Sequence, residues 1–189
     1  LASIAITVLI IDRLNQRRER SQTKERLIRE MGSQDNGTAI RAAEELRAAG
    51  WLADGSLREQ NFKHANLAGA ILDGADLRGA SLRGAQLENA SFNDARLEKA
   101  DLSGARLINC DFNNANLSGA HLNEAQIVNA DFMEADLSGT DLSWAYLPKA
   151  VLVRANLTEA NLRNVDLRGA NLEEAVLVGA QCTDADFSG

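Results

Sequence analysis

Histidine, cysteine and aspartate side chains are the residues of this 189-residue chain that could support catalysis or bind a metal. The histidines, His64 and His121, lie far apart in the sequence and have no partner at zinc-type spacing. The chain contains no glycine-rich phosphate loop and no nucleophile motif. We therefore expect both histidines to be surface residues, and we predict no catalytic residue, no metal site and no cofactor.

Aspartate recurs at intervals that are multiples of five, a pattern that could indicate calcium binding. These residues are Asp101, Asp111, Asp131, Asp136, Asp141, Asp166 and Asp186. The β-helix repeats that bind calcium are glycine-rich nonapeptides, and this repeat is different. Aspartate also accepts hydrogen bonds from nearby turn amides, which is the role we expect here.

The aspartates belong to a five-residue repeat that runs from Gln60 to Ser188. Counting every fifth residue from Phe62 to Phe187 gives 26 central positions, of which 19 are Leu, five are Phe, one is Ile127 and one is Cys182. The residue two before the centre is Ala in 22 of the 26 copies. A period of five matches neither a helix nor a strand. A fixed short period instead predicts a solenoid, in which each unit buries its apolar face against its neighbours.

The residue two after the centre indicates how each repeat ends. It is Gly in ten copies, Asn in five and Asp in two. These residue types tolerate positive φ and favour tight turns. Each pentapeptide is therefore predicted to be a short extended piece followed by a corner.

The pattern A(D/N)LXX, as in Ala75-Asp76-Leu77-Arg78-Gly79, resembles the pentapeptide repeat family. The resemblance implies an all-β solenoid, a right-handed quadrilateral β-helix in which four pentapeptides form one 20-residue coil. Leu, Phe and Ala would point inward, and the 26 repeats would make about 6.5 coils. Phe92, Phe112 and Phe132 are 20 residues apart and are expected to stack.

Both cysteines occupy inward positions of this repeat. Cys110 replaces an Ala and Cys182 replaces a Leu. They are 72 residues apart, which is ~17 Å along the stack and too far for a disulfide. We expect two buried free thiols, a state that suits a reducing compartment.

The N-terminal residues combine an apolar stretch with a basic one. Residues 1–11 carry no charge, and residues 1–31 hold seven Lys/Arg against four Asp/Glu, a net +3. Eleven apolar residues are fewer than the ~20 that span a bilayer. We interpret them as the end of a transmembrane helix, which would anchor the β-helix on the cytoplasmic side of a membrane. A buried helix and a trimmed signal peptide are the alternatives. The membrane-proximal residues would be Leu9, Ile10, Ile11, Arg13, Arg17, Arg18 and Arg20.

We divide the chain into three parts. Residues 1–31 form the end of the membrane helix and a solvated, charged juxtamembrane helix. Residues 32–56 form a loop and a capping helix over 38–49, which Gly50 ends. Its apolar face and Trp51 are expected to cover the first coil, because the ends of solenoids need caps. Residues 57–189 form the β-helix.

Apolar residues interrupt the polar outward positions in one region. They are Ile108, Val128, Met133, Trp144, Tyr146, Pro148, Val151 and Val153. A contiguous apolar patch often marks a partner surface, and Trp, Tyr and Met favour such surfaces. The alternative is that these side chains simply pack on one another.

These features favour a non-enzymatic, membrane-tethered scaffold that docks an unidentified protein, which could belong to a membrane complex. The resemblance suggests a second function, because some family members mimic duplex DNA and bind DNA gyrase, protecting it from quinolones. A third candidate is a self-assembling element that forms a homodimer through its C-terminal end. Residues 32–189 hold 13 Lys/Arg against 23 Asp/Glu, a net −10, so we expect no direct binding to nucleic acid.

Overall fold

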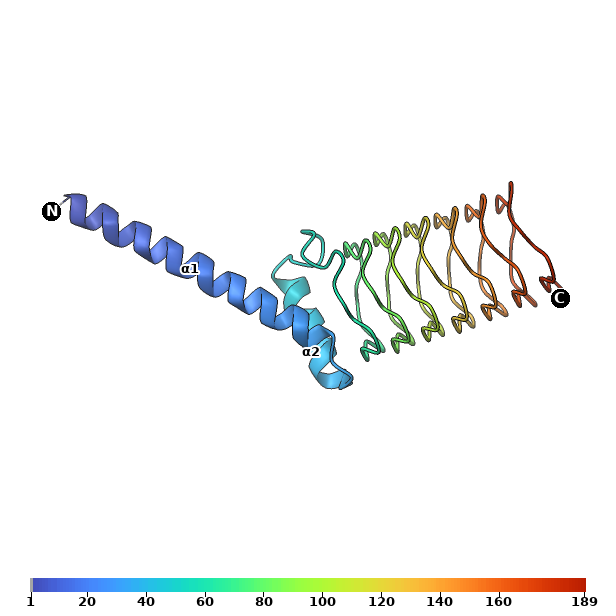
Figure 1. The fold of residues 1–189 in the computed structure, drawn as a ribbon, viewed down its shortest axis with the longest axis horizontal. Helices are drawn as coiled ribbons and strands as arrows, with labels where there is room; N and C mark the ends of the chain where they lie inside the picture. The colour runs from blue at the N-terminus through green and yellow to red at the C-terminus, as the bar shows by residue number, and fades with distance from the viewer. Residues whose placement is uncertain (1) are drawn as a thin grey trace.

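A long N-terminal helix leads into a short capping helix and then into a rod of stacked coils (Figure 1). The computed structural model describes the backbone of residues 2–189 and the side chains of residues 10–189. The helices are α1 (Ala2–Met31) and α2 (Asn36–Ala48). In Figure 1, α1 projects away from the rod at the end opposite to the C-terminus.

The rod is built from coils of 20 residues. Isolated parallel β-bridges join residues 20 apart in sequence, from Asn61 and Ser81 at one end to Asp166 and Asp186 at the other. Backbone hydrogen bonds run between successive coils, as from the Leu102 amide to the His121 carbonyl at 2.7 Å. The described residues contain no longer strand, because a corner follows each short extended piece after a few residues.

A left-handed residue forms each corner. From His64 to Asp184, every residue two after a repeat centre has φ between 55° and 77°. The amide of the next alanine donates to the central carbonyl, as from Ala115 to Phe112 at 3.0 Å, which closes a β-turn. The prediction of positive φ is confirmed, and it extends beyond Gly, Asn and Asp to Glu, Lys, Arg and Trp.

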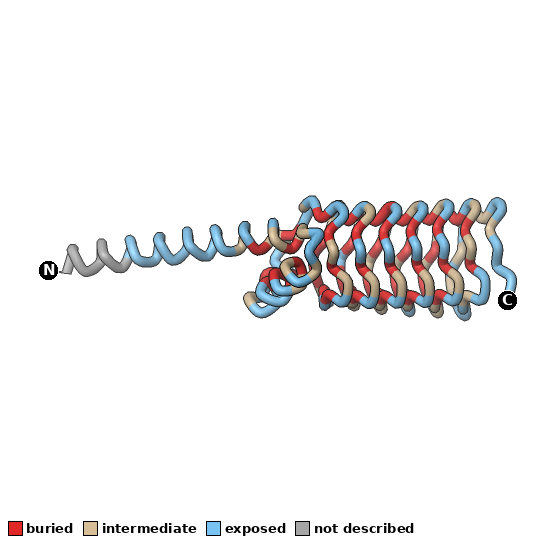
Figure 2. Tube along the Cα trace, turned by 90° about the horizontal axis from the view of Figure 1, so that it is seen from below, coloured by how far each residue is buried: buried red, intermediate tan, exposed pale blue. Residues whose placement is uncertain are grey.

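The core consists of columns of inward side chains (Figure 2). The central Leu, Phe and Ile residues and the preceding Ala residues are buried from Phe62 to Leu167, which confirms the inward positions. Phe92, Phe112 and Phe132 stack with ring centroids 4.9 and 4.8 Å apart, as predicted. From Ala170 onward, the inward residues up to Cys182 are only partly buried.

The N-terminal helices contribute to the same apolar core as the rod. Leu27 and Met31 of α1 are buried, so the prediction of a solvated juxtamembrane helix is wrong for the C-terminal end of this helix. Leu46 of α2 and Trp51 belong to the same cluster. The end of α1 therefore packs against α2 and helps to bury its apolar side chains.

Capping interactions set the limits of α2. The Asp35 carboxylate accepts a hydrogen bond from the Thr38 amide at 2.8 Å, so that Asp35 is the N-cap. This hydrogen bond also lowers the pKa of Asp35. The helix begins two residues before the predicted Thr38, because the cap lies at Asp35. Gly50, with φ of 70°, follows its end.

The described part of the chain contains no helix that is long and apolar enough to cross a membrane. The side chain of Leu9, one of the predicted membrane-proximal residues, lies outside the described residues.

Candidate protein-interaction surface

The histidines and the acidic residues of the rod do not form a metal site. His64 and His121 are exposed, as expected. Within the described residues, no group of three or more His, Cys, Asp or Glu side chains is placed to hold a metal ion.

The recurrent aspartates bind turn amides of their own repeats. Asp101 accepts a hydrogen bond from the Ser103 amide at 3.0 Å, and Asp186 accepts one from Ser188 at the same distance. Partial burial disfavours ionisation of Asp101, but the hydrogen bonds from Ser103 outweigh it, so the pKa of Asp101 is lowered. A hydrogen bond from Arg168 lowers the pKa of Asp166. These carboxylates stabilise corners of the coil.

The cysteines are both free, as predicted. Cys110 is buried, and its thiol donates to the Leu87 carbonyl at 2.9 Å. Burial raises the pKa of Cys110 to about 12, which makes this thiol unreactive at neutral pH. Cys182 is only half-buried, which differs from the prediction of two buried thiols, because the coil around it is less covered.

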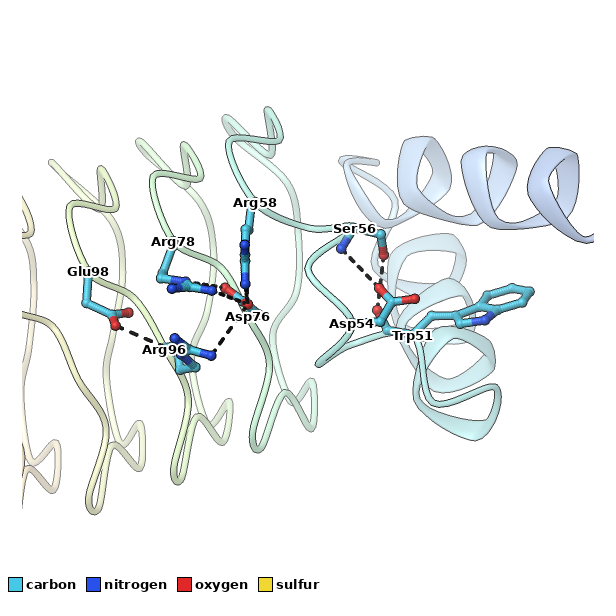
Figure 3. Close-up of polar contacts among 8 residues, drawn as sticks. All are labelled: Trp51, Asp54, Ser56, Arg58, Asp76, Arg78, Arg96 and Glu98. Carbon is cyan, nitrogen blue, oxygen red and sulfur yellow. Dashed lines mark hydrogen bonds and ion pairs between the residues drawn. The ribbon is translucent and has the colours of Figure 1, made fainter.

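Asp76 is a buried carboxylate that the sequence reading did not single out (Figure 3). Only 1% of this residue is exposed, and its oxygens accept from Arg58 Nε and Arg78 Nε, each at 2.8 Å. The Asp76 amide donates to the Leu52 carbonyl at 2.9 Å. The cluster therefore ties the capping segment to the first coil. Extending the 20-residue register back to Arg58, which precedes Arg78 by one coil, would have revealed it.

The predicted apolar residues lie on two neighbouring faces of the rod and at the corner beside them. The Asn109 amide donates to the Val128 carbonyl at 2.9 Å, and the Asn129 amide donates to the Pro148 carbonyl at 3.2 Å. These bonds place Ile108, Val128 and Pro148 in successive coils, one above the other. Met133 and Val153 follow in the same way on the next face, through the Glu134 amide.

The eight residues differ in exposure. Trp144 is 64% exposed, Tyr146 is 43% exposed and Met133 is 40% exposed. The remaining five are half-buried: Ile108, Val128, Pro148, Val151 and Val153. We call these eight residues the Trp144 patch. Trp144, Tyr146 and Met133 are therefore more exposed than the five residues around them.

Trp144 has an unusual backbone conformation for a bulky residue. Its φ is 61°, and its amide donates to the Arg163 carbonyl at 3.0 Å. A left-handed conformation costs a non-glycine residue roughly 1–2 kcal/mol. Ten of the equivalent positions hold Gly, so the fold does not require a side chain here. The same conformation recurs at the other corners, so the distinctive feature of position 144 is the bulky indole that it carries.

Pro148, the chain's one proline, suits its place in the patch. It is the second residue of the turn in which the Ala150 amide donates to the Leu147 carbonyl at 3.2 Å, a position that favours proline. In other repeats the amide at this position binds an Asp or Asn two residues earlier, as Met133 binds Asp131. Here that residue is Tyr146, so the absent N–H leaves no acceptor unpaired.

Ion pairs border the patch. Arg168 binds Asp166 at 2.6 Å beyond Pro148, in the same columns as Pro148 and Tyr146. On the neighbouring face, Arg154 Nε binds Glu174 at 2.6 Å. An apolar centre with a charged margin is the usual anatomy of a protein interface.

The predicted membrane-proximal residues lie on α1, away from the patch. Ile10 and Ile11 are 54% and 50% exposed. The four arginines of this set, Arg13, Arg17, Arg18 and Arg20, are also exposed. The Arg20 guanidinium lies 5.3 Å from the centre of the Trp51 ring, which is a cation–π contact.

Comparison with known proteins agrees with this architecture. The chain matches the family model described as Pentapeptide repeats in eight copies, over residues 61–98, 100–139, 135–173 and 155–189. Members of this family fold as right-handed quadrilateral β-helices, in keeping with coils of four pentapeptides. No curated protein matches the chain at a significant level.

Three solved structures illustrate the similarity. A pentapeptide repeat protein from Nostoc PCC 7120 is 39% identical over 41% of this chain and 64% of its own, with a TM-score of 0.40. HetL, from Nostoc sp. strain PCC 7120 and involved in regulating heterocyst differentiation, is 24% identical over 78% and 94% of the two chains, with a TM-score of 0.25. QnrB1, a plasmid-mediated fluoroquinolone resistance protein, is 18% identical over 68% and 78%, with a TM-score of 0.36.

Proposed function

The chain belongs to the pentapeptide repeat family, and on this premise we propose that it is a non-enzymatic scaffold that docks a partner protein through the Trp144 patch. Family members are in general structural and interaction proteins. The exposed, left-handed Trp144 within an apolar patch is the observation that carries the proposal.

The patch supports docking by its composition. Aromatic residues in fully desolvated pockets dominate the free energy of many protein interfaces. Trp144 and Tyr146 provide two such side chains within three residues. Between the ion pairs at its margin, the apolar surface has no charged residue to desolvate along the column of Ile108, Val128 and Pro148.

Photo-crosslinking can test this proposal. A photoreactive residue at position 146 should capture one defined protein in cells, and the same residue at position 86 is the matched control. Gln86 lies in the same column as Tyr146, three coils away, and it is exposed. Capture should be lost in Trp144→Gly, a change that suits the left-handed backbone. Equal capture from positions 146 and 86 would refute a specific patch.

We further propose that the N-terminal half of α1 associates with a membrane, with the rod on the cytoplasmic side. Ile10, Ile11 and Leu14 are each at least 50% exposed and lie within about 100° of one another on α1. Arg18 falls within this arc, where it can reach anionic headgroups.

Deletion of residues 1–23 tests the membrane proposal better than removal of the whole helix. Leu27 and Met31 remain, and their side chains are buried against the cap. The truncated protein should move from the membrane fraction to the supernatant while keeping the thermal stability of the rod. A truncated protein that stays in the membrane fraction would contradict tethering through α1.

Two other functions have specific support. Net charge of −10 over residues 32–189 favours a DNA mimic that binds gyrase or topoisomerase, as the similarity to the fluoroquinolone resistance protein also suggests. However, Arg106, Arg154 and Arg168 are paired with carboxylates on the rod surface, which reduces its negative potential. Protection of gyrase from a quinolone in a supercoiling assay would support this function.

The second of these functions is self-assembly. Phe187 is 43% exposed and Leu172 and Leu177 are only half-buried, so a homodimer through the C-terminal coil would cover apolar surface. Light scattering should then give twice the mass of 20.4 kDa, and Phe187→Asp should restore the monomer.

A further inference from the structure

A basic stripe runs along one face of α1, at the end of the molecule remote from the Trp144 patch. It consists of Arg13, Arg17, Arg20 and Lys24, which are spaced by four, three and four residues. This spacing places all four side chains on one face of a helix. Asp12 and Glu19, the acidic residues between positions 10 and 24, fall about 110–130° away from the stripe.

The stripe lies in a re-entrant corner of the molecule. A hollow there is lined by residues of α1 and by the segment after α2: Arg17, Arg20, Ser21, Lys24, Ala49, Gly50, Trp51 and Asp54. Its one carboxylate, Asp54, is paired with Lys24, so the net charge of the lining is positive. A second hollow lies along α1 itself, between Arg13, Gln16, Arg17 and Arg20. Figure 3 shows the Trp51 ring pointing away from the rod. Arg20 and Lys24 lie over this ring, 5.3 and 5.1 Å from its centre, so Trp51 forms the base of the corner beneath them.

Three cations of the stripe are not neutralised within the described part of the protein. The ion pairs of α1 there join Lys24 to Asp54 and Arg26 to Glu30 and Glu45. Arg13, Arg17 and Arg20 take part in none of them. From Arg13 to Arg20 these charges span about 11 Å along the helix axis, at 1.5 Å per residue.

We propose that this corner binds an acidic, extended segment of a partner protein. Carboxylates spaced along a peptide would meet the guanidinium groups in turn, in the planar, paired geometry that arginine favours. Trp51 is only 8% exposed and lies beneath Arg20 and Lys24, so it would sense a bound peptide through these two side chains. The proposal does not rest on the function proposed for the Trp144 patch.

Two other anionic partners fit the corner less well. A flat bilayer would have to reach Arg20 past Gly50 and Trp51, which wall the hollow. Its contact with α1 is better made through the neighbouring arc of Ile10, Ile11 and Leu14, whose centre lies about 100° from that of the stripe. Nucleic acid would bring many phosphates close to a domain of net charge −10, which disfavours binding.

Fluorescence anisotropy of a labelled peptide of alternating glutamate and glycine tests the proposal on the full chain. Binding should saturate and should weaken as salt is added, because the contacts are between exposed charges. The double variant Arg17→Gln, Arg20→Gln should bind about tenfold more weakly. Arg18→Gln, which removes an arginine outside the stripe, is the matched control and should change the affinity less than about twofold.

Trp51 reports where the peptide binds. In a Trp144→Gly background it is the sole tryptophan, and its emission should change with the same midpoint as the anisotropy. A peptide of alternating glutamine and glycine should have no effect. The proposal is overturned if the acidic peptide fails to bind, if Arg18→Gln weakens binding as much as the double variant, or if only vesicles containing phosphatidylserine bind to the stripe.

Discussion

Replacing two equivalent core leucines, one in the middle of the rod and one in its last coils, gives a direct measure of how stacking stabilises this fold. Leu117 and Leu177 occupy the same column, three coils apart, and both are repeat centres. Leu117 is fully buried between the coils of Leu97 and Leu137. Leu177 lies against the coil of Leu157 and is only half-buried. Substitution by Ala therefore removes the same atoms from two different degrees of burial.

The burial of each side chain sets the expected loss. Truncation of a leucine removes about three carbon atoms, worth roughly 0.8 kcal/mol each when fully buried, and the cavity adds to this value. We expect Leu117→Ala to lower the free energy of unfolding by about 3 kcal/mol. Leu177→Ala should lower it by about 1.5 kcal/mol, because roughly half of its contacts are present.

Urea unfolding followed by circular dichroism measures both values, with an unchanged dependence on urea as the control for the unfolded state. Amide exchange adds a second measurement, since Leu177→Ala should speed exchange chiefly in the C-terminal coil and Leu117→Ala on both sides of its coil. An equal loss of stability for the two variants would refute the argument that stacking from both sides supplies the core.

Further predictions concern the charged and thiol groups. Asp76→Asn should destabilise the protein by about 1–2 kcal/mol, and by less in an Arg58→Gln background, because the two side chains are paired; equal losses in both backgrounds would show that they are not coupled. A thiol reagent at pH near 8 should modify Cys182 and spare Cys110, whose pKa is raised to about 12 by burial, whereas both should react in denaturant. Folding lowers the pKa of Asp101 and of other turn aspartates, so their contribution to stability should be complete above about pH 5 and be lost as the pH falls below about 4. A melting temperature that stays constant down to about pH 2 would show that these aspartates do not stabilise the fold.

The repeat is local information, and for that reason the rod could be predicted residue by residue. Each central Leu or Phe must point inward because a shift of one position would expose the whole column. The same register correctly placed Phe92, Phe112 and Phe132 in one stack. It also placed the left-handed residues, although Gly, Asn and Asp account for only 17 of the 26 positions. At the other positions, backbone hydrogen bonds between coils hold residues such as Trp144 in a left-handed conformation that non-glycine residues disfavour.

The N-terminal region could be predicted less well, because it lacks such a repeat. The apolar residues at the end of α1 are too few to show whether they face water, and only the packing of α1 into the common core buries Leu27 and Met31. Asp76 is a similar case, since its burial depends on Arg58 and on the capping segment.

The sequence by itself determined the solenoid, its inward columns, the corners and the positions of the apolar residues of the Trp144 patch, because all of these follow from a strict period. Only the tertiary structure decided how much of each patch residue is exposed, how α1 meets the cap, and that Arg17 and Arg20 share a corner with Trp51. The physical reason is that these features depend on packing between side chains that are distant in sequence. The five-residue repeat does not determine how such side chains are placed relative to one another.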